Sequence, residues 1–513
     1  MATGESADGN GVERSGAGGG LVASFVGLER VMSRPIDWSA PDMPDLWVYH
    51  LNYFDDLPAT ASGASPPWKA ELVEHWIEQN PPVAGAAWDP YPTARRIANW
   101  VRWIFETDPR EPTDAVVRGR LLASLAAQAR HLHGNLELHL LGNHLLTNAK
   151  GLVAAGLLFG GDEGDRWLSR GLGLLEQELD YQVLSDGGHI ERSPMYHAVL
   201  LGDVLDVLNL LRASGEASFI ADGLLDGTAA MLGWLAAVTH PDGQPAFFND
   251  TACRAAPTLA ELAAYAGRLG VRWRPPSFDR VHMLDPSAYA RLSSTDGRTV
   301  VVFDAAGPMG PDEQPGHGHC DALSFELSRD GRRLVVNSGI STYEAGDVRH
   351  AERGTAAHNT VRIDRQEQSE IWASHRVGRR ARPTRSGVEG PEAYGAHDGY
   401  ARLPGGPMHE RRLRLEPGAL VVTDRFSGKG EHELEWFLHL HPDCDAAVDG
   451  NGVVVSREDH PVARLVCPDG LPVSVERGTW HPGFHESVPN VRVEARCRAA
   501  LPASYVIVLE WLD

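Results

Sequence analysis

The first half of the chain is dominated by apolar residues that recur every three to four positions. That spacing is typical of amphipathic helices, and turns rich in Gly, Asp or Pro separate one such segment from the next. No strand-like alternation interrupts the series, so the sequence predicts consecutive helical hairpins that close into a helical toroid or solenoid. The expected helices cover residues 94–103, 115–131, 144–159, 166–179, 196–212, 224–238 and 259–269.

Near residues 275–286 the pattern changes to short segments in which apolar and polar residues alternate. Such segments, spaced by Gly, Asp and Pro turns, are typical of an antiparallel β-sandwich. We therefore expect an α+β multidomain fold with a Gly- and Ser-rich disordered leader (1–20), an (α/α) toroid (21–285) and a β-sandwich (286–513). The expected strands cover residues 299–303, 323–327, 334–336, 360–363, 411–415, 420–422, 434–440, 452–456 and 504–509.

Length and charge narrow the classes of function. A chain of 513 residues exceeds what one hydrophobic core supports, so two or three domains are expected. The net charge of −22 argues against a nucleic-acid partner, because phosphate binding needs a basic surface. An acidic sugar polymer stays possible, since a local basic cleft can operate within an acidic envelope. Five arginines in residues 376–385 offer one such cleft, although a solvated loop is the favoured interpretation of that run.

The cysteines and the N-terminus carry little functional signal. Five cysteines without a CxxC pair favour neither a disulfide framework nor a thiolate zinc site. The first 20 residues lack the apolar core of a signal peptide, and no apolar run is long enough to span a bilayer. We therefore expect a cytoplasmic protein without a membrane partner; a chain that had lost an export signal would instead be periplasmic or secreted.

Three polar clusters in the helical half are candidates for a site. Asn143 and His144 open a helix, where an N-cap explains Asn143 as well as any function does. Residues 185–197 form a Gly-rich loop that enters a helix through Ser193-Pro194, which places Tyr196 and His197 in the first turn. Glu191 and Arg192 precede them, and this density favours a site. Residues 247–251 add Asp250, which could cap a helix or line the same cleft.

The sheet half contributes histidines. Residues 316–327 read GHGHCDALSFEL, with His317 between two glycines and His319 after the second, and residues 356–361 read AAHNTV, with His358. Imidazole titrates near neutral pH and also binds metals, so catalytic, metal-binding and core roles are all open.

This inventory suits removal of a proton next to a carboxylate. No convincing pair of carboxylates for glycoside hydrolysis is visible, and the GxSxG elbow of serine hydrolases is absent. In a uronic acid, Asn143, Arg192 or Arg353 could neutralise the C6 carboxylate and stabilise the enolate. A tyrosine or histidine would then take the C5 proton, and a second such group would protonate the leaving oxygen at C4. A tyrosine would need nearby cations to serve as the base.

The same motifs resemble the heparinase II/III family of polysaccharide lyases. The resemblance runs from about Trp47 to the end of the chain, and its most specific part is GHGHxD together with HNTV. It implies an incomplete (α/α) toroid, an antiparallel β-sandwich and a substrate cleft between them. It also implies site roles: Asn143 neutralises the carboxylate, Tyr196 is the acid/base, His317 is its partner, and His144 and Arg353 assist binding.

Arg192, His197 and Asp250 are further candidates to bind substrate. The early segments 47–57 and 88–103 also look like members of the family found beside exopolysaccharide synthesis genes.

Some members of the family hold a structural zinc with two histidines and an aspartate. His319 and His358 match the histidine positions, whereas Asn337 stands where the family has Asp. A neutral amide is a poorer zinc ligand than a carboxylate. The chemistry itself implies no cofactor.

Three functions follow from these observations. The first is a lyase that cleaves a uronate polysaccharide by β-elimination. The second is a non-catalytic carbohydrate-binding protein of exopolysaccharide assembly on the same scaffold. The third is a glycoside hydrolase, kept open by Asp186, Glu191 and Asp250.

Overall fold

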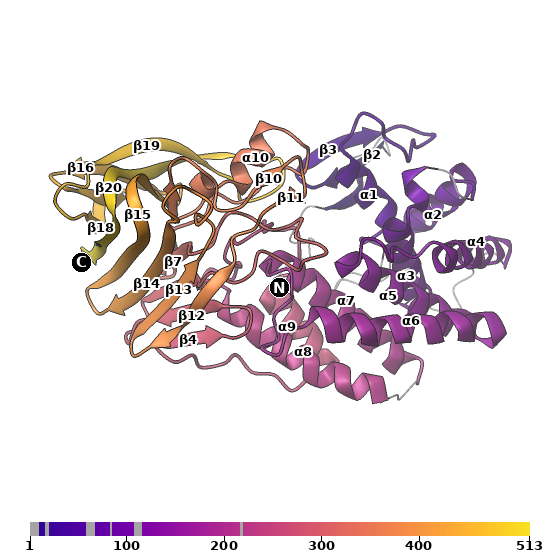
Figure 1. The fold of residues 1–513 in the computed structure, drawn as a ribbon. Coiled ribbons are helices and arrows are strands. Elements are labelled where there is room, and N and C mark those ends of the chain that lie inside the picture. Colours follow the sequence, from indigo (N-terminus) through magenta and orange to yellow (C-terminus); the bar gives the residue numbers. More distant parts are fainter. Residues whose placement is uncertain are drawn as a thin grey trace. The chain divides into compact units, whose positions relative to one another are not determined.

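The computed structural model describes residues 10–15, 20–57, 67–82, 85–106, 115–215 and 219–512. The chain packs into two compact units (Figure 1). Unit 1 comprises residues 1–182 and 202–226, and unit 2 comprises residues 183–201 and 227–513.

Unit 1 combines a small sheet with a series of helices. The sheet is antiparallel, in the order β1 (Gly11–Ser15), β2 (Gly20–Phe25) and β3 (Leu28–Met32). The helices are α1 (Asp45–Tyr53), α2 (Pro67–Gln79), α3 (Pro90–Glu106), α4 (Ala115–Gly134), α5 (Gly142–Phe159) and α6 (Gly161–Gln182), with a short 3-10 turn, η1 (Ala86–Trp88).

The expectation of a disordered leader over residues 1–20 is wrong for Gly11–Ser15, which form the edge strand β1. Strand β1 pairs with β2 in a register that places Val12 opposite Ala23. The composition of this short stretch gives no sign of that pairing. Residues 1–9 and 16–19 lie outside the described residues.

Close helix packing in unit 1 depends on small residues. A Cβ on Gly156 of α5 would lie 2.6 Å from the backbone nitrogen of Leu168 in α6, and one on Gly171 would lie 2.9 Å from the carbonyl oxygen of Ala149. Only glycine lets the two backbones approach this closely, and the contact buries the apolar face of α5.

Two helices run through both units. They are α7 (Pro194–Ala213) and α8 (Phe219–Ala237), and the first turns of α7 belong to unit 2. Among the described helices, α7 alone has the length and apolar composition of a membrane span, but 72% of that window is buried inside the protein, as in a core helix. The last long helix, α9 (Leu259–Arg268), begins with a capping box between Thr258 and Glu261.

Unit 2 contains two antiparallel sheets. The smaller has the order β4 (Val281–Leu284), β5 (Tyr289–Ser293), β6 (Thr299–Asp304), β7 (Phe325–Arg329) and β8 (Arg332–Val335). The larger has the order β12-β13-β14-β15-β20-β18-β17-β16, with β19 paired to β20 and β9 paired to β15. Its strands are β9 (Val361–Ile363), β12 (Pro383–Glu389), β13 (Glu392–His397), β14 (Met408–Glu416), β15 (Ala419–His439), β16 (Cys444–Asp449), β17 (Gly452–Arg457), β18 (His460–Val466), β19 (Val473–Trp480) and β20 (Val488–Trp511).

One apolar core joins the two sheets. It takes Leu292, Val301 and Phe303 from the smaller sheet and Leu413 and Leu434 from the larger one. Along β14 buried residues alternate with partly exposed ones, as expected of a strand with one face in the core, whereas every residue of β6 is buried. The sandwich is therefore held by facing apolar surfaces.

The predicted fold class is confirmed: a helical region precedes antiparallel sheets. The change falls between Arg268, where α9 ends, and Val281, where β4 begins. The compact units divide the chain differently, because residues 183–201 and 227–268 pack with the sheets. Three short elements of unit 2 position the site below: α10 (Asp347–Arg353), η2 (Thr355–Ala357) and a hairpin of β10 (Ile371–Trp372) and β11 (Arg376–Val377).

Candidate active site

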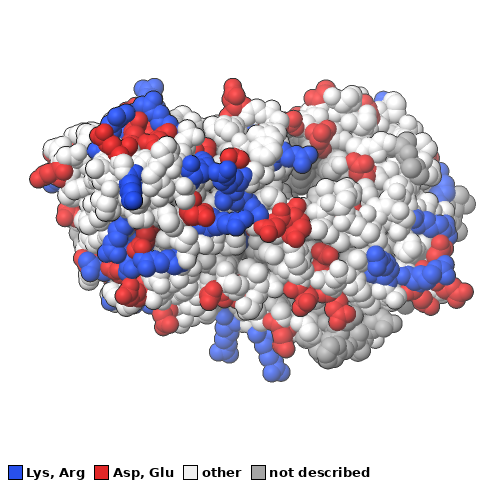
Figure 2. Space-filling view, viewed as in Figure 1, with Lys and Arg blue, Asp and Glu red and all other residues white. Residues whose placement is uncertain are grey.

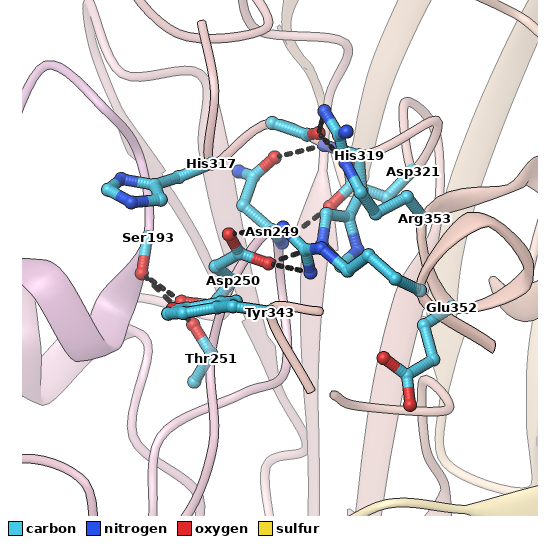
Figure 3. Close-up of polar contacts among 12 residues, drawn as sticks. Ser193, Asn249, Asp250, Thr251, His317, His319, Asp321, Tyr343, Glu352 and Arg353 are labelled. Carbon is cyan, nitrogen blue, oxygen red and sulfur yellow. Dashed lines mark hydrogen bonds and ion pairs between the residues drawn. The ribbon is translucent and has the colours of Figure 1, made fainter. Parts of the chain in front are cut away.

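The two histidines of the GHGH segment lie in a loop that precedes strand β7 (Phe325–Arg329), which was expected to begin at Leu323. Strand β7 begins only at Phe325, and the preceding residues, including Leu323 with a left-handed φ of 64°, form a loop. In Figure 3 the imidazoles of His317 and His319 point apart, with Asn249 and Asp250 between them. The two histidines therefore have different surroundings although they are two residues apart.

Tyr196 and His317 form a stacked pair. Their rings lie 3.8 Å apart, centroid to centroid, at an interplanar angle of 15°. The start of α7 fixes the tyrosine, because the hydroxyl of Ser193 accepts a hydrogen bond from the Tyr196 backbone nitrogen (3.1 Å) and donates one to the carbonyl of Asp250 (2.5 Å). The Ser-Pro cap seen in the sequence thus has a positioning role as well as a helix-starting one.

A buried carboxylate orients His317. The Nδ1 atom of His317 lies 2.5 Å from Oε2 of Glu191, whose side chain is 1% exposed, whereas that of His317 is 13% exposed. With an ionised Glu191, Nδ1 carries the proton and donates it, which leaves Nε2 as a proton acceptor. Arg192, next along the chain, holds a left-handed φ of 59°, the kind of backbone outlier that gathers at functional sites.

Tyr343 is the residue that the sequence reasoning missed. Its hydroxyl lies 3.0 Å from the hydroxyl of Tyr196, and the Arg349 guanidinium lies 5.0 Å from its ring. Burial raises the pKa of Tyr196 well above its usual range, and Tyr343 acts in the same direction. Tyr196 is therefore a neutral phenol at neutral pH. The only signal for Tyr343 in the sequence is an aromatic residue in a polar loop after β8.

Beside this pair lies a buried charge cluster. Arg349 donates to both oxygens of Asp250, at 2.5 and 2.7 Å, and Nε2 of His319 lies 2.8 Å from Asp250 Oδ1. Burial alone would raise the pKa of Asp250, but Arg349 and His319 hold it well below its usual range. Burial lowers the pKa of His319 to about 4, against the effect of Asp250. Asp250 is thus an ionised anchor of the fold.

The contacts of four residues, Asp250, Arg192, His197 and Arg353, argue against their expected role in substrate binding. Asp250 is fully buried in the cluster just described. Arg192 is buried and donates to Asp304 (2.8 Å) and to the carbonyl of Ser287 (2.7 Å). Full burial and committed hydrogen bonds leave neither side chain free to reach a sugar.

The side chains of His197 and Arg353 are also buried and hydrogen-bonded within the protein. His197 is buried, with Nε2 at 2.9 Å from the carbonyl of Met231 and its ring 4.5 Å from Trp234. Arg353 is fully buried and donates to the carbonyls of Gly318 and Ser374, so it ties the histidine turn to the β10–β11 hairpin.

Asn143 and His144 lie in unit 1, at the start of α5. Asn143 is 5% exposed, and among the described residues no donor reaches its Oδ1 atom. The side chain of His144 is 29% exposed, with Nδ1 at 3.1 Å from Glu137 Oε1 and its ring 4.6 Å from that of Tyr91. The ring of His144 is partly exposed, whereas Asn143 is nearly buried, and the expected role of each in substrate binding stays a prediction.

The expected zinc ligands do not come together as a set. In the described part of the chain neither ring nitrogen of His358 has a hydrogen-bond partner, nor has Nδ1 of His319, and the two rings lie 5.3 Å apart. Asn337, however, accepts from the hydroxyl of Ser324 (2.6 Å) and donates to the carbonyl of Phe247 (2.9 Å). Its amide is committed elsewhere, so the residues present do not fit a zinc held by two histidines and a third ligand.

A second group of metal-ligand atoms lies within the described residues. Single ligand atoms of Asp250, His317 and His375 all lie within 4.8 Å of one another. Arg349 already occupies both oxygens of Asp250 and places a positive charge where the cation would bind. This electrostatic conflict disfavours a metal at that point.

Comparisons with known proteins agree with the motifs. The model described as "Heparinase II/III N-terminus" matches residues 65–267, and that described as "Heparinase II/III-like, C-terminal" matches residues 279–508. A heparin-sulfate lyase of Bacteroides thetaiotaomicron is 26% identical over 340 residues, which are 58% of this chain and 47% of that protein. The chain thus spans about half the length of this relative.

Another relative is not named as a lyase. The FtsZ-localized protein C of Caulobacter vibrioides is 26% identical over 455 residues, which are 82% of this chain and 74% of that protein. Among solved structures, a heparinase III superimposes with a TM-score of 0.73 at 19% identity, covering 93% of this chain and 79% of that one. A heparan sulfate lyase from Pedobacter heparinus gives 0.64 at 18% identity, covering 94% and 80%. At these identities the structures establish the fold alone.

Proposed function

Because the chain belongs to the heparinase II/III family, we propose that it is a polysaccharide lyase that cleaves a uronic-acid-containing polysaccharide by β-elimination. The observation that carries the proposal is the stacked pair of Tyr196 and His317. A neutral phenol and an imidazole held by a buried carboxylate stand side by side, as a proton donor and a proton acceptor.

The reaction needs one proton removed and one supplied. Nε2 of His317 accepts the proton from C5 of the uronate, and the electron pair forms the C4–C5 double bond as the C4–O bond breaks. The phenol of Tyr196, whose hydroxyl lies 3.0 Å from that of Tyr343, gives its proton to the leaving oxygen. After the products leave, the proton on Nε2 of His317 is released and Tyr196 regains one from solvent, which restores both groups. Neutralisation of the C6 carboxylate, which makes the C5 proton more acidic, is the role that the sequence predicts for Asn143.

Hydrolysis is less well supported, because it needs two carboxyl groups that can reach the sugar. Asp250 is occupied by Arg349, and Glu191 by His317. Asp186 accepts from the backbone nitrogen and the hydroxyl of Ser287, at 2.9 and 2.6 Å. All three carboxylates that would support a hydrolase are therefore hydrogen-bonded to other parts of the protein.

The proposal is tested by the product. Heparan sulfate, alginate and polygalacturonate are each incubated with the protein, and the unsaturated sugar end is followed by its ultraviolet absorbance. We expect a signal from at least one polymer and its loss, by about 10²- to 10⁴-fold, in Tyr196→Phe. Tyr394→Phe on β13 is the matched control and should keep full activity. A folded protein that yields no unsaturated product, or full activity in Tyr196→Phe, contradicts the proposal.

A non-catalytic carbohydrate-binding role is the second candidate. It is favoured by one observation: a relative that matches 82% of this chain is named for its localisation with FtsZ and not for a lyase activity. In that case the protein would bind a polysaccharide without releasing an unsaturated end, and Tyr196→Phe would bind as the wild type does.

A further inference from the structure

The hairpin of β10 and β11 has one face in the protein core and one in solvent. Ile371 pairs with Val377 across the hairpin, and both pack in a small apolar cluster with Met309. The next pair, Trp372 and Arg376, faces the opposite side, because successive residues of a strand alternate. The indole of Trp372 is 50% exposed, which is unusual for so large an apolar ring.

The tip of this hairpin reaches the candidate active site. The ring of His375 lies 5.1 Å from that of Tyr343 and 5.7 Å from that of His317. The carbonyl of Ser374 accepts a hydrogen bond of 2.9 Å from the buried Arg353, so the tip is fixed. Arg376 therefore follows directly on a residue whose ring lies beside His317, which places the hairpin next to the proposed catalytic pair.

This face carries an unpaired positive charge on a protein that is acidic as a whole. Arg376 is exposed, and in the described part of the chain its guanidinium forms no ion pair. The nearby carboxylate of Glu370 accepts from the backbone nitrogen of Arg379, at 3.3 Å. Figure 2 shows Lys and Arg side chains gathered over the region of β10 and β11. An unpaired arginine on a chain of net charge −22 favours an anionic ligand.

We propose that this face, which we call the hairpin subsite (Trp372 and Arg376), binds an acidic sugar next to the one that is cleaved. The indole offers a flat apolar surface to the sugar ring, and Arg376 pairs with its carboxylate or sulfate. The position of the subsite relative to the cleaved bond rests on the proposed function. It narrows the substrate to a polymer with acidic groups on neighbouring sugars.

A glycine supports the orientation of the indole. A Cβ on Gly378 would lie 3.0 Å from Cζ3 of Trp372 and 2.8 Å from Oε2 of Glu370. The ring thus rests over a position without a side chain. Gly378→Ala should displace the indole while it keeps every functional group of the subsite, which separates the role of ring orientation from the presence of the ring.

Binding is measured in the Tyr196→Phe protein, so that no product forms. The probes are heparan sulfate and alginate, with uncharged dextran as the comparison. Trp372→Ala and Arg376→Gln should each weaken binding of the acidic polymers about tenfold, and Arg376→Gln should also reduce its salt dependence. Arg385→Gln is the matched control: Arg385 belongs to the same arginine run but pairs with Glu410, so binding should not change.

Binding tests the hairpin subsite and product formation tests the lyase reaction, so the two proposals can fail independently. Unchanged affinity in both hairpin variants overturns the subsite, as does equal affinity for dextran or no binding of either acidic polymer. Weakened binding in the variants without any unsaturated product from the wild type upholds the subsite and removes the lyase. Product formation with unchanged KM, when Trp372→Ala and Arg376→Gln are made in the protein with Tyr196 intact, upholds the lyase and removes the subsite.

Discussion

The surroundings of His317 and His319 differ although both imidazoles meet a buried carboxylate. Glu191 holds His317 on one edge, and the ring stacks on Tyr196 with part of its surface exposed. Asp250 holds His319, but Arg349 neutralises that carboxylate with two hydrogen bonds, and the ring is 1% exposed. Access and the counter-ion, more than residue type, thus separate a group suited to chemistry from one that supports the fold.

The largest expected effect comes from exchanging each histidine for glutamine. His317→Gln keeps a donor for Glu191 but removes the base, so activity should fall about 10²- to 10⁴-fold with little change in the free energy of unfolding. His319→Gln should do the reverse: it should lower that free energy by about 1–3 kcal/mol and keep measurable activity. Initial rates and urea unfolding of the two variants check both statements.

Equal losses of activity with equal losses of stability would remove the distinction between the two histidines. So would full activity in His317→Gln, since the proposed base would then be dispensable.

The sequence was sufficient for the change from helices to strands, because hydrophobic periodicity depends on local burial, but it missed the sheet β1–β3 and the helices α1 and α2. It singled out Tyr196 and His317, whose rings the structure brings together. Alternation could not separate His317 from His319, because residues two positions apart face the same side of a strand, and both precede the strand, which begins at Phe325. Tyr343 was missed because its place beside Tyr196 depends on a contact between residues 147 positions apart.

The burial of Arg192 and Arg353 was equally invisible in the sequence. An arginine in a motif suggests a ligand contact, because arginine is almost never fully buried unless its donors are satisfied. Here the donors of Arg192 are satisfied by Asp304 and by backbone carbonyls from β-sheet loops that the sequence does not place nearby. Partners of this kind become visible only with the tertiary structure.

The second prediction concerns the carboxylate beside His319. Asp250→Asn leaves the buried Arg349 without its counter-ion, so the free energy of unfolding should fall by about 3–5 kcal/mol. The matched control is Asp330→Asn, which breaks the exposed ion pair with Arg298 and should cost about 0–1 kcal/mol. Urea unfolding of the three proteins measures the difference. A cost for Asp250→Asn as small as that of the control would show that the cluster does not anchor the fold.

The third prediction follows from the pKa of His319, which burial lowers to about 4 from the usual 6.5. Between these values the unfolded chain binds a proton that the folded His319 does not, so stability is lost as the pH falls from 6.5 toward 4. The free energy of unfolding should decrease by about 1.4 kcal/mol per pH unit from this residue. Burial lowers the pKa of His197 and of His439 to about 3, which adds to the loss.

Denaturant unfolding between pH 7.5 and pH 5 checks this, with His319→Gln as the comparison. The variant should show a shallower dependence on pH, by about one proton. An identical slope in both proteins would mean that His319 titrates alike in the folded and unfolded chains.

The smallest effect is expected at Asn337, the position on which zinc binding depends. Its Oδ1 atom accepts from Ser324, and its Nδ2 atom donates to the carbonyl of Phe247, so the wild type should retain much less than one zinc per chain after dialysis. Asn337→Asp removes the donor to that carbonyl and adds the carboxylate that zinc prefers beside two histidines. Elemental analysis should then find more zinc, and zinc should raise the Tm of this variant only. One zinc per chain in the dialysed wild type would instead require Asn337 to leave its present partners, which would join the open nitrogens of His319 and His358 into a true metal site.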